Sequence, residues 1–132
     1  YGAFFHSDTV QTMGHYIHDM KKFPVDALVA GGHKFHGPKG SGFLFVRKEK
    51  KIHPFIHGGA QERNMRGGTE NVIGIIGIAK ALELAYEDMS GHRAHVEKIK
   101  KHFIEKLIAE LPGVAFNGRS QDLSKSLYTV LN

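Results

Sequence analysis

Residues 26–46, DALVAGGHKFHGPKGSGFLFV, decide how the first half of the chain folds. Two apolar runs, 26–30 and 42–46, have the length and composition of strands. Pro38 and the glycines between the runs permit a sharp reversal, which favours an antiparallel return of the second strand. The stretch therefore predicts a strand, a turn and a returning strand.

An earlier strand is expected over residues 2–6, an apolar and aromatic-rich run that leads into a Ser-Asp pair. Residues 9–13 after it are compatible with a helix. Two strands joined by a crossover of this length indicate a βαβ unit, whose parallel strands deliver their C-terminal ends to one edge of the sheet. Asp8, His33 and Lys34 would then lie just past those ends, where open α/β sheets bind ligands.

The second half of the chain carries a long loop and then a broken helix. Residues 58–70 consist mainly of glycine, arginine and polar residues without a period, as in loops kept for function. Asn71 can cap the helix that follows, in which apolar residues form a broad face. The pair Ser90-Gly91 interrupts this helix, and Pro112-Gly113 ends its second part.

The interruption of the helix suggests a boundary between two domains. We assign residues 1–91 to a first domain, and residues 92–132 to the second half of the long helix and the start of a second domain. A β-type run over residues 127–131 predicts a last strand. Strand-like runs thus begin almost at the first residue and stop at the last, as expected of a piece of a longer protein.

The composition argues against several classes of function. The absence of cysteine excludes disulfide frameworks, cysteine-type zinc sites and a thiol nucleophile within these residues. The net charge of +5 is scattered, so we expect no nucleic-acid binding and interpret the basic run 47–51 as a solvated connection. No apolar run approaches the ~20 residues that span a bilayer, which favours a protein without a membrane span, in the cytoplasm.

Ten histidines raise the question of a metal site. His15 with His18, and His92 with His95, have the i, i+3 spacing that can place two ligands on one helical face. No third ligand is evident beside either pair, so we predict solvent-exposed histidines and no metal site. Residues 37–42 do not form a Walker phosphate loop, because that pattern leads into a helix and this one leads into a strand.

The expected strand ends bring together a carboxylate, an imidazole and an amine. Pyridoxal 5′-phosphate (PLP) needs an amine for its Schiff base, an acidic residue beside its pyridine nitrogen and donors for its phosphate. Asp8, His33 and Lys34 could supply these groups. From these residues alone, an ordinary surface lysine after a strand is the favoured interpretation of Lys34.

Three segments resemble motifs of the NifS/IscS-type cysteine desulfurases, which belong to the class-V aminotransferases. GGHKFHGPKGSG at residues 31–42 is similar to the family's lysine motif, whose His-Lys-x-x-Gly-Pro-Lys-Gly core is highly specific. HSDTVQ at residues 6–11 resembles the strand-end Asp-x-x-Gln motif, and GGAQERNMRGGT at residues 58–69 resembles the Gly-Gly-x-x-Glu-Arg-x-x-Arg-x-Gly-Thr loop. The resemblance extends over all 132 residues, and Lys39 favours this branch over the SufS and selenocysteine-lyase branch.

The resemblance implies a role for each matching residue. Lys34 would form the Schiff base with PLP and move protons at the substrate α-carbon. Asp8 would pair with the pyridine nitrogen, and Gln11 would hydrogen-bond the phenolic oxygen of the ring. Val10 would pack against one ring face, and His33 would reach the phosphate.

The resemblance also implies the architecture of the parent enzyme. It would be a fold-type I PLP enzyme, with a three-layer α/β/α large domain around a mostly parallel sheet and a broken helix leading into a small α+β domain. Thr69 resembles the hydroxyl that the family lends to the neighbouring subunit's phosphate, which implies a homodimer with shared sites. The implied reaction converts L-cysteine to L-alanine and an enzyme persulfide, with sulfur donated to an acceptor protein for iron–sulfur cluster or other sulfur-cofactor assembly.

The chain departs from the family at Gly31, where the family usually has a serine, so we expect weaker anchoring of the phosphate. By the resemblance, the persulfide-forming cysteine and the arginine for the substrate carboxylate lie beyond Asn132. The N-terminal phosphate loop and the ring-stacking histidine would precede Tyr1. We therefore expect these 132 residues to be inactive alone. The alternatives are another class-V enzyme, such as a selenocysteine lyase, and a non-catalytic interaction module, which the absence of cysteine supports.

Overall fold

A computed structural model describes residues 2–132 of the chain. The chain forms two compact units, the first ending at Tyr86 and the second comprising Glu87–Asn132. The elements, in chain order, are β1 (His6–Asp8), β2 (Ala27–Gly31), the 3-10 helix η1 (Gly32–Phe35), β3 (Gly42–Val46), α1 (Gln61–Asn64), α2 (Val72–Glu87) and α3 (Met89–Glu110). That the second unit begins the small domain of a larger enzyme stays a prediction.

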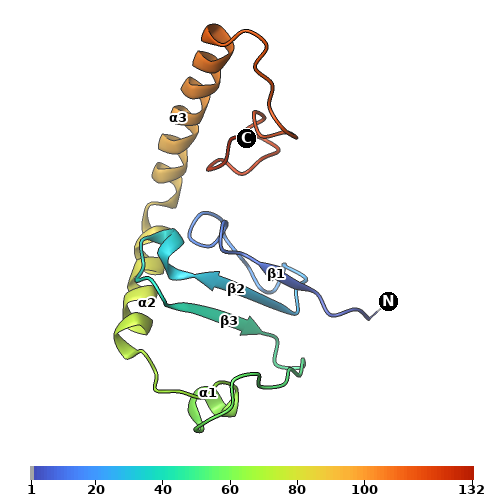
Figure 1. The fold of residues 1–132 in the computed structure, drawn as a ribbon, viewed down its shortest axis with the longest axis vertical. Helices are drawn as coiled ribbons and strands as arrows, with labels where there is room; N and C mark the ends of the chain where they lie inside the picture. The colour runs from blue at the N-terminus through green and yellow to red at the C-terminus, as the bar shows by residue number, and fades with distance from the viewer. Residues whose placement is uncertain (1) are drawn as a thin grey trace. The chain divides into compact units, whose positions relative to one another are not determined.

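The three strands form one mixed sheet in the order β1-β2-β3 (Figure 1). β1 pairs in parallel with β2, and Asp8 lies opposite Val29. β3 runs antiparallel to β2, and Gly42 lies opposite Gly31. The parallel pair and the antiparallel return are both confirmed, and the second and third strands lie within one residue of their predicted bounds.

Two predictions in the N-terminal segment were wrong. The first strand is His6–Asp8 rather than residues 2–6, because pairing with β2 starts only at Phe5, whose carbonyl accepts from the Asp26 and Ala27 amides. Residues 9–13 form hydrogen-bonded turns rather than a helix. Gly14, with a φ of +80°, interrupts the helical backbone within these turns, which continue to Tyr16, so no regular helix covers the crossover between β1 and β2.

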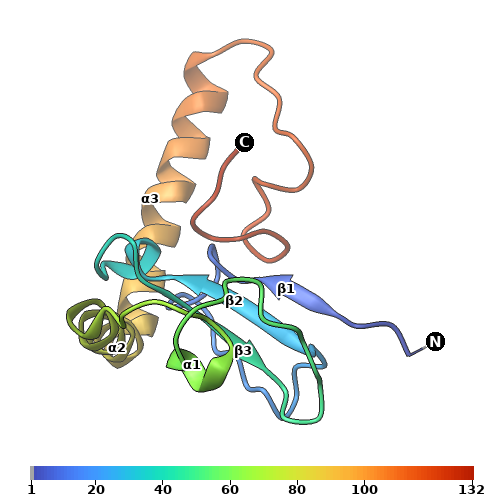
Figure 2. The ribbon, with the colours of Figure 1, turned by 60° about the horizontal axis from the view of Figure 1, so that its bottom comes forward.

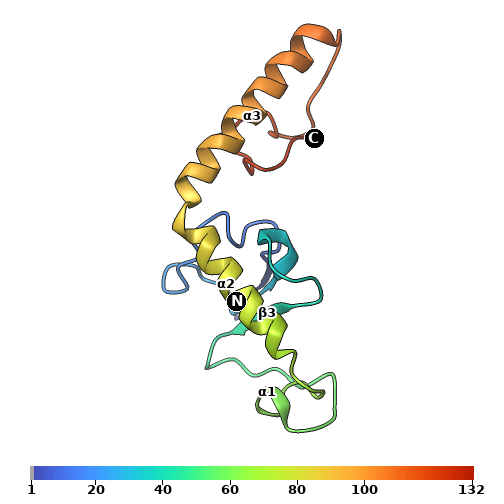
Figure 3. The ribbon, with the colours of Figure 1, turned by 90° about the vertical axis from the view of Figure 1, so that its left-hand side faces the viewer.

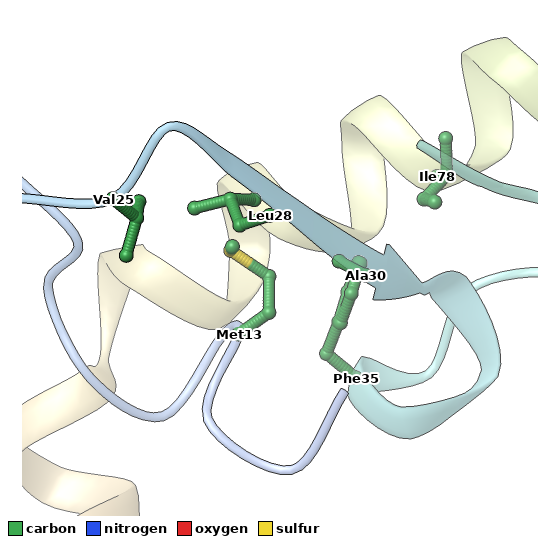
Figure 4. Close-up of a cluster of buried hydrophobic side chains, with 6 residues drawn as sticks. All are labelled: Met13, Val25, Leu28, Ala30, Phe35 and Ile78. Carbon is green, nitrogen blue, oxygen red and sulfur yellow. The ribbon is translucent and has the colours of Figure 1, made fainter. Parts of the chain in front are cut away.

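The core of the first unit lies between β2, η1, α2 and the crossover segment. Six apolar side chains form it, shown in Figure 4: Met13, Val25, Leu28, Ala30, Phe35 and Ile78. Leu28 and Ala30 point to the same face of the sheet because side chains alternate along a strand. Phe43 and Phe45 of β3 lie opposite them in the register and pack against the same cluster. This core fixes β2 and η1, the two elements that carry the candidate site.

The basic stretch after β3 is solvated only in part: Lys48, Glu49 and Lys51 are exposed as predicted, whereas Arg47 and Lys50 are half-buried against the rest of the unit. Arg47 donates hydrogen bonds from its guanidinium to three carbonyl oxygens of the crossover, those of Met20, Phe23 and Val25, at 2.6–2.8 Å. Lys50 forms a 3.0 Å ion pair with Asp26. Both cations hold the crossover against the sheet, because a guanidinium can donate to several backbone oxygens at once.

Asp26 ties the start of β2 to two other segments. Its carboxylate accepts a hydrogen bond from the Phe5 amide at 2.8 Å, in addition to the ion pair with Lys50. The Phe5 hydrogen bond, and then Lys50, hold the pKa of this carboxyl below its ordinary value. Asp26 therefore helps to keep β1 beside β2.

The break in the long helix occurs at Asp88, two residues before the predicted position. Asp88 has φ −122° and ψ 37°, outside the helical region, and it separates α2 from α3. The predicted cap of α2 is confirmed, since the Asn71 carboxamide oxygen accepts a hydrogen bond from the Gly74 amide at 3.0 Å. The predicted end of α3 before Pro112 is also confirmed.

The second unit consists of α3 and a C-terminal segment that returns along it (Figure 3). The strand predicted over residues 127–131 does not form, because the polar groups at this end bind elsewhere. The Asn132 carbonyl accepts from the Asn117 amide and the Ser120 hydroxyl, and the Leu127 carbonyl accepts from Lys100. Among the described residues, no helix is long and apolar enough to cross a membrane.

Candidate functional site

The candidate site lies at the edge of the sheet where β1 and β2 end. Asp8 is the last residue of β1, and η1 follows directly on β2. Because the two strands are parallel neighbours, their C-terminal ends meet at the same edge. The fold thus places the Asp8 carboxylate and the His33 and Lys34 side chains at adjacent strand ends, as the sequence predicted.

The turn of η1 determines which of its side chains face solvent. Gly32 and Phe35 are buried, and Phe35 belongs to the core cluster. His33 and Lys34, between them, are exposed. The turn is closed at both ends, since the Gly32 amide donates to the Ser41 carbonyl and the Gly37 amide donates to the Gly32 carbonyl. Lys34 therefore stands on a rigid support with its amine directed away from the core.

The Lys34 amine has no hydrogen bond or ion pair with any residue in the described part of the chain. A lysine held by fixed partners would have to give them up before it could bond to a carbonyl carbon. Lys34 has no such partners among the described residues to give up, so its amine can bond to a carbonyl carbon without first losing a hydrogen bond. An exposed, unpaired amine beside a strand end is what the attachment of an aldehyde cofactor requires.

Thr9 anchors the segment that carries Val10 and Gln11, and sequence reasoning missed it. Thr9 is buried, and both its amide and its hydroxyl donate to the Val29 carbonyl, at 3.0 Å and 2.7 Å. The Asp8 carboxylate in turn accepts from the Val10 amide at 2.8 Å. A threonine directly after a strand-end aspartate was the available signal, because its hydroxyl can replace a ladder hydrogen bond where the strand ends.

Gly31 lies beside both His33 and Val10. A Cβ atom placed on Gly31 would lie 3.4 Å from the His33 ring and 3.8 Å from a Val10 methyl group, both ordinary van der Waals distances. The backbone of Gly31 is extended, with φ −114°. Neither packing nor backbone conformation requires glycine here, so a serine would fit. The neighbours of Gly31, His33 and Val10, are two of the residues that the sequence assigned to the cofactor.

Thr69 lies in the loop between α1 and α2, and within residues 2–132 no hydrogen bond joins it to the strand-end residues. Figure 2 shows this loop between the labelled elements α1 and α2. The short α1 turn that precedes it was not predicted from the sequence. Glu62, Arg63 and Asn64 have positive φ angles of 47°, 58° and 66°. Such a conformation costs about 1 kcal/mol or more per non-glycine residue, so the surrounding loop must hold it in place.

The two histidine pairs differ in exposure: His92 and His95 are exposed as predicted, whereas His15 and His18 are half-buried. His18 contacts the Thr12 hydroxyl and the Tyr16 carbonyl, both at 2.9 Å, and its ring packs edge-on against Phe23. Its partners are therefore structural, which the i, i+3 spacing with His15 did not indicate. Across residues 2–132, no three potential ligand side chains lie together.

Comparison with known proteins supports these observations. A sequence model of the family described as aminotransferase class-V matches residues 1–131. The chain is 45% identical over 128 residues to a protein named cysteine desulfurase IscS from Dictyoglomus turgidum, which covers 96% of this chain and 32% of that protein. A protein of the same name from Methanosarcina thermophila is 47% identical over 115 residues, which is 87% of this chain and 28% of that protein. The chain thus spans about 30% of the length of these relatives.

Solved structures show the same relationship. A structure titled NifS-like protein is 45% identical and has a TM-score of 0.76, over 79% of this chain and 28% of its own. The NifS-like protein from Rickettsia africae is 34% identical and has a TM-score of 0.79, over 86% of this chain and 31% of its own. The mixed sheet and its helices therefore correspond to part of the α/β domain of such proteins.

Proposed function

Because this chain belongs to the class-V aminotransferase family, we propose that the protein of which it is a part is a PLP-dependent cysteine desulfurase. The substrate would be L-cysteine, and the products would be L-alanine and a persulfide on the enzyme. The observation that carries the proposal is the placement of Asp8 and Lys34 at the ends of two adjacent parallel strands. The sulfur would pass to an acceptor protein for iron–sulfur cluster or other sulfur-cofactor assembly, in the cytoplasm.

The residues at the strand ends fit PLP in charge and position. An exposed amine and an exposed carboxylate lie at one edge of the sheet, with Gly31 between β2 and η1 beside His33 and Val10. When bound, PLP supplies an electron-withdrawing ring that stabilises negative charge at the substrate α-carbon. The amine of Lys34 would bond to the cofactor and, once displaced by substrate, would move a proton at that carbon. A free lysine, with a pKa of ~10.4, is protonated at neutral pH, so covalent attachment also prepares the amine for this role.

The other residues would hold and tune the cofactor. Asp8 would keep a proton on the ring nitrogen, which the ring needs in order to withdraw electrons. Gln11 would donate a hydrogen bond to the phenolic oxygen, and Val10 would pack against one ring face. His33 would donate to the phosphate. All four side chains belong to the strand ends or to the segments that Thr9 and η1 fix to β2.

The site would be shared between two subunits. Thr69 would donate its hydroxyl to the cofactor phosphate of a second copy, in a homodimer. This arrangement agrees with the lack of a described hydrogen bond between Thr69 and the strand-end residues of its own chain. A donor from a second subunit would also support the phosphate where Gly31 offers no hydroxyl.

The absence of cysteine from the 132 residues supports a second proposal for the chain taken alone. Without a thiol to receive sulfur, the chain would bind partners or cofactor but would not turn over cysteine. For the full-length protein, the alternative to a cysteine desulfurase is a related enzyme that acts on selenocysteine.

A turnover assay with the full-length, PLP-loaded protein tests the proposal. We expect L-alanine and sulfide from L-cysteine in the presence of a thiol reductant, and a higher kcat/KM for L-cysteine than for L-selenocysteine. The reverse preference would favour a selenocysteine lyase. Bound PLP without turnover of either amino acid would contradict the proposal and favour a non-catalytic role.

A further inference from the structure

The loop before α2 is closed by a crossing of its own backbone. Gly67 is buried, and its amide donates to the Ile56 carbonyl at 2.9 Å. A Cβ atom on Gly67 would lie 2.7 Å from both the Cα and the nitrogen of Gly58. These are backbone atoms, which cannot turn aside as the end of a side chain can. Only glycine permits this approach of the two backbone segments.

The residues after the crossing are fixed up to Thr69. The Arg66 guanidinium donates to the Gly67 carbonyl at 2.8 Å. The Gly68 amide donates to the Gln61 side-chain oxygen at 3.2 Å. Both contacts lie within the loop, so the backbone leading to Thr69 has little freedom.

The segment after Thr69 is fixed as well. Asn71 caps α2 through the Gly74 amide, and its carbonyl accepts from the Ile75 amide at 2.9 Å. Ile78 anchors α2 in the core of the first unit. Thr69 is thus an exposed residue between two fixed points, the backbone crossing on one side and the capped helix on the other.

We propose that Gly67 is a positioning residue, whose close crossing with Gly58 sets where the Thr69 hydroxyl is presented to the cofactor phosphate of a second subunit. The inference rests on the proposed function, because it assumes that Thr69 binds this phosphate. The closed loop holds Thr69 in place before the cofactor binds, so less ordering is required on binding. The loop acts through Thr69 and itself touches neither substrate nor cofactor.

A comparison of PLP with pyridoxal, which lacks the phosphate, isolates this role. The dissociation constants of both are measured with the full-length apoprotein by absorbance titration. We expect Gly67→Ala to raise the Kd of PLP about tenfold, the worth of one hydrogen bond to a charged group, and to leave the Kd of pyridoxal unchanged. Thr69→Ala should likewise raise the Kd of PLP about tenfold and leave the Kd of pyridoxal unchanged. The double variant should bind PLP no more weakly than either single variant.

Two variants serve as controls for the alanine substitution itself. Gly113→Ala, in the second unit, introduces an alanine at a positive φ of +79° where its Cβ would meet no atom within 4 Å, and it should change neither constant. Gln61→Ala removes only the contact to Gly68, so the fold should tolerate it, and it should weaken PLP binding about threefold without affecting pyridoxal. If Gly67→Ala does not fold, Gln61→Ala serves as the test variant. A Gln61→Ala protein that binds PLP as tightly as the native protein, or that loses PLP and pyridoxal affinity equally, overturns the inference.

The outcomes separate the inference from the proposed function. If Thr69→Ala leaves PLP binding unchanged, the proposed phosphate contact is wrong, and so is the inference that depends on it. If Thr69→Ala weakens PLP binding but Gly67→Ala does not, only the inference is wrong. Equal weakening of PLP and pyridoxal by Gly67→Ala would show a general structural role and would also overturn the positioning role.

Discussion

Lys34 and Lys100 show how one residue type serves two purposes in the two units. Lys34 is exposed on η1 and has no described partner. Lys100 is only 6% exposed on α3, and its amine donates to the Ser126 hydroxyl at 3.0 Å and to the Leu127 carbonyl at 2.9 Å. Burial lowers the pKa of Lys100 from its ordinary value. A candidate reactive amine is distinguished from a structural one by the burial and hydrogen-bond partners of the lysine, and less by the type of secondary structure on which it lies.

The contrast between the two lysines has a physical basis. Lys100 uses its donors to hold the C-terminal segment against α3, where Arg93 also lies over the Tyr128 ring, 5.5 Å from its centre. Freeing that amine would remove one of the two described donors to the Leu127 carbonyl and the donor to the Ser126 hydroxyl, leaving the carbonyl with the Val130 amide alone. Freeing Lys34 breaks nothing that the structure describes. The comparison can be tested by removing each lysine and measuring activity and stability separately.

The largest expected effect is the loss of activity on Lys34→Ala. We expect kcat for cysteine turnover by the full-length protein to fall at least about 100-fold, since this lysine would carry the proton transfer at the substrate α-carbon. Lys39→Ala is the matched control, an exposed lysine five residues along the same turn region. Equal losses in the two variants would contradict a special role for Lys34.

The next effect is expected at Asp8. Asp8→Asn should reduce kcat about 100-fold, because a neutral amide no longer keeps the ring nitrogen protonated. Gln11→Ala removes one hydrogen bond to the phenolic oxygen and should cost about tenfold or less. Steady-state kinetics on the PLP-saturated variants measure both. A larger loss at Gln11 than at Asp8 would reverse the proposed roles.

Lys100 should affect local stability and not chemistry. Lys100→Ala should destabilise the second unit by about 1–3 kcal/mol, because the Leu127 carbonyl loses a buried partner. Hydrogen exchange at the Asn117 and Val130 amides, both bonded within this unit, would report the loosening. Lys101→Ala, at the neighbouring exposed position, should leave exchange unchanged. A Lys100→Ala variant with native exchange would show that the amine does not hold the segment.

The smallest effect concerns Gly31. A serine fits the space there and would offer a hydroxyl to the phosphate, so Gly31→Ser should lower the Kd of PLP about threefold. Gly31→Ala adds the Cβ without the hydroxyl and should leave affinity unchanged. Titration of the full-length apoprotein compares the two variants. Tighter binding by both would indicate a packing effect and not a phosphate donor.

The sequence predicted those parts of the fold that short-range pattern controls. The strands β2 and β3, their antiparallel turn and the Asn71 cap all follow from apolar runs or from one side chain beside its own helix. The C-terminal strand was wrong because the carbonyls of Leu127 and Asn132 bind side chains and amides distant in sequence. Hydrogen bonds between residues so far apart in sequence cannot be predicted from the pattern of neighbouring residues.

Several residues of the candidate site could be predicted and others could not. Asp8 and Lys34 were placed correctly at adjacent strand ends, because the parallel pairing was predicted from the crossover. Thr9 was missed, and so was Arg47 outside the site, since each acts through a carbonyl more than 15 residues away. The structural Lys100 of the second unit could have been found, because it lies four residues from both Val96 and Ile104, on the half-buried face of α3.

The most direct test of the central claim is borohydride reduction of the full-length, PLP-loaded protein, followed by peptide mass mapping. Reduction fixes the cofactor to the lysine that holds it, so the label identifies that residue without any assay of activity. We predict a pyridoxyl group on Lys34 and none on Lys100. Label on any lysine other than Lys34 would contradict the proposed cofactor site.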